Sequence, residues 1–389
     1  MIQANNINKP FVQFVAGGFS GCRAFRCSFP AYNMAWLEGL GIHPIETPFP
    51  LMDAQILSLT RAFVLKSING WQGAEMTKQL KAAQAKFGFK IFVDYDDQPC
   101  QIDGSFGLPW KPWGPEVKPH TEEDDKPFIE ITKLVDKVIV TNEYMARKLN
   151  EVTKSNNYVV IPNTVPRYLF SAQKKQPIDT DKKQFTIVGS GCPLHSMAPH
   201  KDPTTGADVP GDKGDWASAE WDEFIRRGVK DGYIRYIQLG NPNWLFNDMQ
   251  DKIQTFGWLP PLRYPSFISK LNADIVIAPL VDNVFNKCKS DLRAIEAQIC
   301  SSVLMGSVFD ESPYSNTHKL SQIPLGYTAE QLKTRLFEIG QRDNWNEMIQ
   351  WGWNDLYSNA RITEMEEAVD RYMRLFVEAS KGVVSFDLL

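Results

Sequence analysis

Short apolar runs alternate with amphipathic segments along most of this chain. Runs rich in Val, Ile and Phe predict buried strands, and apolar positions three and four residues apart predict helices between them. Strands are expected at 11–16, 43–48, 89–93, 137–141, 158–161, 184–188, 233–238, 253–256 and 274–278. Helices are expected at 31–40, 75–87, 129–135, 143–152, 219–229 and 264–270, and residues 53–66 are expected to form a helix or a strand plus helix. This alternation of strand and helix predicts parallel, doubly wound α/β sheets.

The alternation stops and restarts once. Residues 173–183 (QKKQPIDTDKK) are polar and contain a proline, which predicts a linker. A chain of 389 residues has the length of about two domains. Beyond Thr328 the pattern is almost wholly helical and ends in a predicted helix at 361–379. We therefore expect two α/β domains followed by a C-terminal helix.

The segment 273–297 (ADIVIAPLVDNVFNKCKSDLRAIEA) holds the most informative polar residues. Its strand ends before a loop that presents Asn286 and Lys289. Ser290 is predicted to cap the following helix, whose first turn would offer N–H groups to a phosphate. Glu296 lies about two turns into that helix, where a carboxylate can accept both hydroxyls of a ribose. An ordinary strand, loop and capped helix explains the same pattern.

Glycine turns follow the first strand of each half. Gly17 and Gly18 (GGFSG) follow the strand at 11–16, and Gly189 and Gly191 (GSG) follow the strand at 184–188. Glycines let a backbone approach a ligand or a packed helix closely, so each turn is either a binding loop or a structural turn.

Acidic residues cluster where the strand at 89–93 ends. The sequence DYDDQ places Asp94, Asp96 and Asp97 there, and open α/β sheets bind ligands at the carboxyl ends of their strands. Asp94 and Asp97 are therefore candidate catalytic residues. A metal-binding D-x-D pair is the competing interpretation.

A long stretch without regular periodicity, 99–127, carries Trp110, Lys111 and Trp113. Loops of this length in compact domains are usually functional or disordered. Aromatic rings stack on bases and on sugar faces, so these residues are candidates for binding a nucleic acid or a saccharide. A proline-rich structural flap is the alternative.

Composition excludes several classes of protein. No apolar run is long enough to span a bilayer, and the start MIQANNINKP lacks the features of a signal peptide, so a cytoplasmic location is expected. The six cysteines form no CxxC pair, which favours reduced thiols over a disulfide framework or a zinc site. Residues 1–176 hold 20 Lys and Arg against 17 Asp and Glu, whereas the remainder holds 22 against 29. A polyanionic partner, if one exists, is expected on the first half.

Four motifs together resemble the GT-B glycosyltransferases of the retaining family 4 type. They are GGFSG, FKIFVDYDD, VVIPNTVPRYLF and APLVDNVFNKCKSDLRAIEA, in that order, and they cover almost the entire chain. The second resembles the D-x-D-D pattern of a subgroup found in bacterial polysaccharide clusters and bacteriophages. One departure is clear: such enzymes carry two glutamates eight positions apart, and here the earlier position is Cys288 while the later is Glu296.

The resemblance implies a layout. It implies two Rossmann-like domains, 1–175 binding the acceptor and 180–355 binding the nucleotide sugar, with 356–389 as a helix returning to the first domain. It implies no metal and no cofactor beyond a UDP- or GDP-linked sugar as co-substrate. Lys289 is then expected to stabilise the departing diphosphate as a catalytic residue. Asp94 and Asp97 are expected to orient the acceptor or to stabilise positive charge on the anomeric carbon. The expected donor-binding residues are Gly189, Gly191, His195, Gly257, Asn286, Lys289, Ser290 and Glu296, and the acceptor side is expected to use Gly17, Gly18, Trp110, Lys111 and Trp113.

The resemblance also implies hexosyl or pentosyl transfer to a hydroxyl with retention of configuration. The acceptor is left open between a saccharide and a hydroxymethylated pyrimidine in bacteriophage DNA, in which case the location would be the host cytoplasm. The missing first glutamate motivates an alternative, a sugar- or nucleotide-binding module with weak catalysis.

Overall fold

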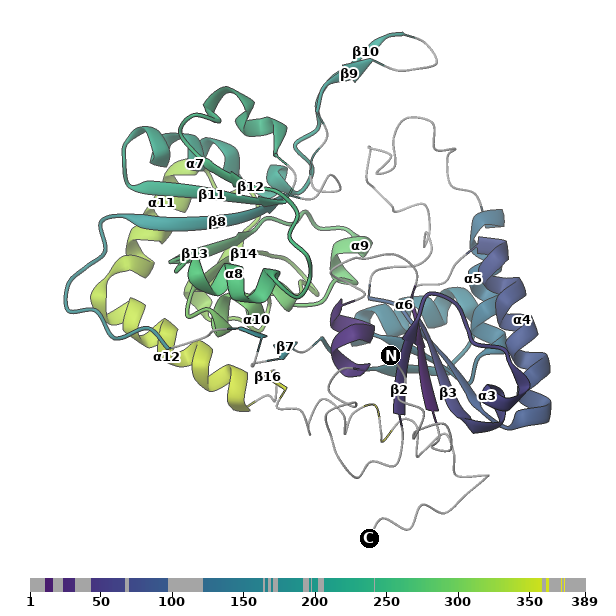
Figure 1. The fold of residues 1–389 in the computed structure, drawn as a ribbon. Coiled ribbons are helices and arrows are strands. Elements are labelled where there is room, and N and C mark those ends of the chain that lie inside the picture. The colour runs from purple at the N-terminus through teal and green to yellow at the C-terminus, as the bar shows by residue number, and fades with distance from the viewer. Residues whose placement is uncertain are drawn as a thin grey trace.

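The computed structural model describes residues 11–16, 24–31, 43–66, 70–96, 122–163, 165–166, 169–170, 174–191, 196, 198–201, 206–240, 242–358, 362–363, 372 and 374. They form two α/β lobes that lie side by side, the first on the right of Figure 1 and the second on the left. Each lobe is built on a six-stranded, wholly parallel sheet. The predicted fold class, two doubly wound domains, is confirmed.

The first sheet has the order β2-β1-β3-β4-β5-β6. Its strand order reverses between β1 and β3, and such switch points are where ligands of open α/β sheets bind. The strands are β1 (Phe11–Val15), β2 (His43–Thr47), β3 (Thr60–Lys66), β4 (Lys90–Asp94), β5 (Lys137–Val140) and β6 (Tyr158–Val160). The helices are the π-helix η2 (Ala24–Ser28), α3 (Ala54–Leu59), α4 (Gly70–Phe87), α5 (Glu122–Leu134) and α6 (Glu143–Thr153).

The second sheet has the order β12-β11-β8-β13-β14-β15, with its switch point between β8 and β13. The strands are β8 (Phe185–Gly191), β11 (Ile234–Gly240), β12 (Gln254–Phe256), β13 (Ile275–Ala278), β14 (Val303–Val308) and β15 (Gln322–Pro324). The helices are η5 (Gly214–Ser218), α7 (Trp221–Lys230), η6 (Trp244–Met249), α8 (Tyr264–Lys270), α9 (Val284–Lys287), α10 (Leu292–Ile299), η7 (Lys319–Ser321), α11 (Ala329–Gly340) and α12 (Arg342–Ser358). A two-residue antiparallel pair, β9 (His200–Lys201) and β10 (Asp208–Val209), projects at the top of Figure 1.

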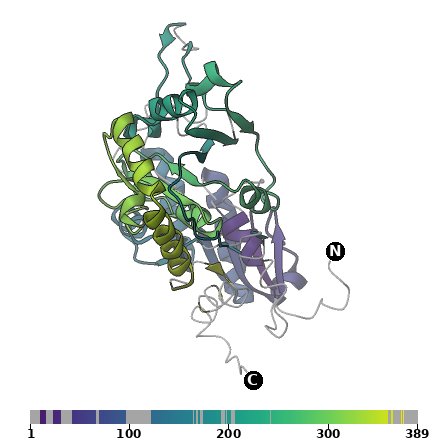
Figure 2. The same ribbon diagram turned by 90° about the vertical axis from the view of Figure 1, so that its left-hand side faces the viewer.

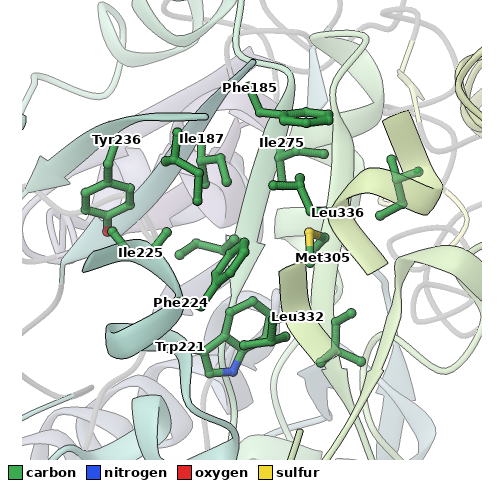
Figure 3. Packing of buried hydrophobic residues seen from close by; sticks show 14 of the residues in the cluster. Phe185, Ile187, Trp221, Phe224, Ile225, Tyr236, Ile275, Met305, Leu332 and Leu336 are labelled. Atoms are coloured by element: carbon green, nitrogen blue, oxygen red, sulfur yellow. The ribbon is translucent and has the colours of Figure 1, made fainter. Parts of the chain in front are cut away.

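The core of the second domain follows from helical spacing. On α7, Trp221, Phe224 and Ile225 recur at three- and four-residue spacing and are all fully buried. Figure 3 shows these side chains packed with the sheet residues Ile187 and Ile275. A β-carbon at Gly228 would lie 2.1 Å from Ile234, so a glycine is what lets α7 lie this close to β11. The pattern therefore specifies both the helix and the face it buries.

The C-terminal part of the chain returns to the first domain. The strand β16 (Ile362–Thr363) pairs with β7 (Val165–Pro166), the short strand that follows the first sheet. Further on, the Tyr372 ring packs edge-on against Phe14 of β1 at 6.0 Å, and its hydroxyl donates to the Arg26 carbonyl at 3.2 Å. The predicted return to the first domain is confirmed, although little of the predicted helix at 361–379 falls within the described residues. The predicted boundaries of the three parts stay predictions.

Candidate functional site

The two sheets present their carboxyl ends to one region, and the segment between β13 and α10 lies there. Figure 1 shows α9 at the edge of the second domain that faces the first. Asn283 caps α9, since its side-chain oxygen accepts from the Asn286 N–H at 2.7 Å. The helix α10 begins one residue later than predicted: its N-cap is Asp291, whose side chain makes no capping hydrogen bond, and Ser290 lies just outside. Ser290 as a helix cap is therefore wrong, and its hydroxyl serves another contact.

This segment is held against the first domain through its backbone. Asn142 donates its side-chain amide to the carbonyls of Lys287 at 3.2 Å and Lys289 at 2.9 Å, while its own oxygen caps α6. Thr141 donates to the Cys288 carbonyl at 3.3 Å. Cys288 is fully buried and packs with the apolar cluster of the first domain. Cys288 therefore contributes to the domain interface.

Asp94 lies at the end of β4 in a buried ion pair. Its carboxylate receives three hydrogen bonds from Arg26, two from Nε at 3.0 and 3.1 Å and one from Nη2 at 2.7 Å. Lys66 Nζ lies 3.5 Å from the Asp94 carboxylate and also pairs with Asp96. Burial lowers the pKa of Arg26, but the charge and hydrogen bonds of Asp94, together with Tyr372 and Asp96, outweigh burial, and the pKa is raised overall. Asp94 has no exposed surface, so the proposed contact with sugar or acceptor stays a prediction while its contact with Arg26 is observed.

Arg26 also reaches toward the second domain. Its Nη1 donates to the Ile161 carbonyl at 2.6 Å and to the side-chain oxygen of Asn163 at 3.1 Å. Asn163 in turn donates its amide to Ser290 Oγ at 2.9 Å, across the domain interface. A line of hydrogen bonds thus connects the carboxyl end of β4 with Ser290, two residues before α10.

Lys289 lies over the ring of Phe285, with Nζ 4.8 Å from its centroid, and 3.9 Å from the carboxylate of Asp215. The same carboxylate accepts from the amide of Asn286 at 2.7 Å and from the Val281 N–H at 3.1 Å. Asn286 is buried, and its own oxygen has no hydrogen-bond partner among the described residues. The structure thus joins the predicted donor-site residues Lys289 and Asn286 through Asp215, which the sequence had not singled out.

Glu296 lies on α10, buried beside two polar partners. Its Oε2 accepts from Arg293 at 2.7 Å and from the Tyr264 hydroxyl at 3.2 Å. Burial raises the pKa of Glu296, and the charge of Arg293 opposes this shift. These three side chains border a cavity of about 20 Å³, room for about one water molecule.

The three predicted donor-site glycines, Gly189, Gly191 and Gly257, differ in whether the packing around them requires a glycine. A β-carbon at Gly189 would lie 2.2 Å from the Tyr236 hydroxyl, so packing inside the second domain already demands a glycine there. Gly191 is the last residue of β8 and pairs with Gly240 of β11. A β-carbon at Gly257 would meet no atom within 4 Å. Of these three, Gly189 has a structural reason that needs no ligand.

Several predicted site residues lie outside the described part of the chain. They are Gly17, Gly18, Asp97, Trp110, Lys111, Trp113 and His195. Within the described ranges, no group of three or more His, Cys, Asp or Glu side chains is arranged to hold a metal ion. No helix among those residues is both long and apolar enough to cross a membrane.

Besides Asp215, Arg293 and Tyr264, sequence reasoning missed four residues on the side of the first domain. Arg26, Lys66, Asn142 and Asn163 each stand at or just beyond the carboxyl end of a strand, or in the helix after it, and this position was the available signal. The local sequence is typical of a helix cap at Asn142, and Asn142 does cap α6. Its two interdomain hydrogen bonds, however, go to a segment some 145 residues away. No local pattern reports such a partner.

Comparison with solved structures identifies the fold. The glycosyltransferase from Rickettsia africae ESF-5 matches with a TM-score of 0.57 and 12% identity, covering 96% of this chain and 100% of that one. Anabaena Alr3699/HepE in complex with UDP and glucose matches with a TM-score of 0.56 and 9% identity, covering 95% and 100%. The pneumococcal O-GlcNAc transferase GtfA in complex with UDP and GlcNAc matches with a TM-score of 0.52 and 12% identity, covering 82% of this chain and 57% of that one.

The chain therefore has the GT-B fold of glycosyltransferases. It spans the whole of HepE and the Rickettsia protein, but little more than half of GtfA and of S. aureus TarM. No protein-family model and no curated protein sequence matches it. At 9–12% identity the likeness is one of fold, and activity has to be argued from the site.

Proposed function

We propose that this protein is a glycosyltransferase that uses a nucleotide sugar as donor. The proposal rests on one observation. At the carboxyl edge of the second sheet, next to its switch point, Lys289 and Ser290 lie between β13 and α10, and Ser290 meets Asn163 of the first domain. Glu296 lies on α10 itself. The GT-B fold along the whole chain supports the same conclusion.

The chemistry needs little machinery. Breaking a sugar–phosphate bond builds negative charge on the departing diphosphate and positive charge on the anomeric carbon. Lys289 supplies a positive charge, and the start of α10 supplies backbone N–H groups that the Asp291 side chain does not cap. Glu296 would accept the ribose hydroxyls. By its resemblance to family 4, the enzyme would transfer with retention, and the leaving phosphate would deprotonate the acceptor.

For Asp94 we propose a positioning role. A carboxylate that has no exposed surface and receives three hydrogen bonds from Arg26 holds that arginine in place. Asp97 keeps its proposed role at the acceptor or the anomeric centre.

The test is a transfer assay read by mass. The purified chain is incubated with UDP- and GDP-linked hexoses and pentoses, each with an oligosaccharide mixture or with hydroxymethylated DNA. A product heavier by one glycosyl unit in one acceptor arm supports the proposal and identifies the acceptor class, and NMR of that product gives the anomeric configuration. Addition of EDTA is expected to leave the rate unchanged. The proposal would be contradicted if the protein showed no transfer and no donor hydrolysis with any of the donors.

A binding module with weak catalysis is the competing function. The specific observation behind it is Cys288, which is buried against the first domain where family members carry a glutamate. Donor hydrolysis without acceptor separates the two, because a binding module would bind UDP or GDP and release no sugar.

A further inference from the structure

The hydrogen bonds from Arg26 to Ser290 have a fixed direction. A guanidinium can only donate, so the atom of Asn163 that faces Arg26 at 3.1 Å has to be the side-chain oxygen. The amide nitrogen of Asn163 then faces Ser290 and donates to its Oγ at 2.9 Å. The usual ambiguity of an asparagine side chain is removed here by its neighbour.

This direction decides what the Ser290 hydroxyl does. A serine oxygen that accepts a hydrogen bond still carries its own hydrogen, which is left to donate elsewhere. Ser290 is only partly buried, next to Lys289, and no described residue accepts a hydrogen bond from it. Its hydroxyl is therefore set as a donor at the edge where the proposed diphosphate binds.

The start of this line of contacts is rigid. Arg26 and Asn163 are 1% and 4% exposed, and Asp94 is fully buried. Arg26 is fixed by Asp94 on one side and by the Ile161 carbonyl on the other. It lies in a π-helix, an element that occurs often at functional sites. A charged pair of this kind keeps its geometry, since either partner alone would be a buried, uncompensated charge.

We propose that Arg26 and Asn163 are positioning residues that hold the Ser290 hydroxyl as a hydrogen-bond donor to the diphosphate of the nucleotide sugar. This inference rests on the proposed function. Arg26 and Asn163 belong to the first domain and Ser290 to the second, so the donor is set only while the two domains lie together. Ser290 itself would touch the ligand, whereas Arg26 and Asn163 act through it.

The decisive variant is Asn163→Asp. The introduced carboxylate is nearly isosteric and still accepts from Arg26, but it can no longer donate to Ser290, whose hydroxyl must turn to donate to it instead. At pH 8, about four units above an ordinary carboxyl pKa, kcat is expected to fall about 10²-fold, the loss typical of one missing donor to a developing oxyanion. The melting temperature is expected to stay near that of the wild type.

Three further variants separate positioning from mere structure. Ser290→Ala should lower kcat as much as Asn163→Asp does. Ser290→Thr should retain most of the activity because it keeps the hydroxyl. The double variant Asn163→Asp with Ser290→Ala should have a kcat no lower than that of either single variant. Asn157→Asp is the matched control. Asn157 lies just before β6, at the amino end of the sheet, and its side-chain amide donates to the Thr132 carbonyl. It should leave kcat unchanged.

The outcomes are distinct. Three results would overturn the inference: additive losses of kcat in the double variant, an unchanged kcat in Asn163→Asp, or an unchanged kcat in Ser290→Ala. In each case, turnover by the wild type would still support the proposed function. Should Asn163→Asp not fold, the pair Ser290→Ala and Ser290→Thr decides by itself. If the wild type neither turns over any nucleotide sugar nor binds UDP or GDP in calorimetry, both the proposed function and this inference fall.

Discussion

The Arg26 guanidinium and the Asp94 carboxylate form a buried pair with Nη2 2.7 Å from Oδ2, and neither side chain exceeds 1% exposure. Asp94 ends β4 and Arg26 lies in η2, so the pair joins two elements at the ligand edge of the first sheet. Because the Arg26–Asp94 pair forms only in the folded protein, its contribution to the free energy of unfolding can be measured separately from its effect on activity.

Asp94→Asn is expected to destabilise the protein by about 3–5 kcal/mol, because it leaves Arg26 buried with its charge uncompensated. Urea unfolding measures the free energy. Asp248→Asn is the control, since its exposed pair with Arg226 should contribute little. A stable Asp94→Asn protein that has lost only turnover would instead favour direct contact between Asp94 and substrate.

Glu296→Ala is expected to weaken nucleotide-sugar binding by about 1–3 kcal/mol, because the ribose hydroxyls lose a charged acceptor. Calorimetry with the donor found in the transfer assay measures this. Glu338→Ala, on the surface of α11, is the control. Unchanged donor affinity in Glu296→Ala would remove Glu296 from the donor site.

Glu296→Gln tests the raised pKa of Glu296. Burial favours the protonated carboxyl in the folded state, so this residue's contribution to stability is fully present below the ordinary pKa of 4.5 and is lost as pH rises through the raised value. The stability of Glu296→Gln relative to wild type should therefore grow from about pH 4 upward and then level off. Urea unfolding at several pH values measures this, and a difference independent of pH would contradict it.

Lys289→Ala is expected to lower kcat more than donor affinity, if the ammonium mainly meets charge that grows on the leaving diphosphate. Steady-state kinetics together with calorimetry separates the two effects. Lys287→Ala is the matched control two residues away, since that side chain pairs with Asp282. If donor affinity and kcat/KM fall by the same factor while kcat is unchanged, Lys289 contributes only to donor binding.

Asn142→Asp separates the two tasks of Asn142. Aspartate still caps α6, but it cannot donate to the carbonyls of Lys287 and Lys289, and it repels them. Hydrogen exchange in 283–291 should become faster, in line with a local loss of about 1–3 kcal/mol, while α6 keeps its protection. Faster exchange in α6 alone would show that Asn142 is only a cap.

The sequence was sufficient for the fold, because strands and helices follow from local periodicity. The apolar runs ending at Val93 and Ala278 became β4 and β13, and the Trp221, Phe224 and Ile225 spacing became the buried face of α7. The short strands β14 and β15 were missed. β14 follows α10 directly and so continues the alternation, whereas β15 follows the short helix η7.

Only the tertiary structure decided what the polar residues contact. Asp94 ends β4 and Glu296 lies on α10, as their sequence patterns predicted, yet Asp94 is paired with Arg26 and Glu296 with Arg293 and Tyr264. Ser290 was expected to cap a helix and instead accepts from Asn163, 127 residues away. Periodicity records which face of an element is buried, whereas a hydrogen-bond partner depends on how distant elements pack, and that arrangement leaves no local trace in the chain.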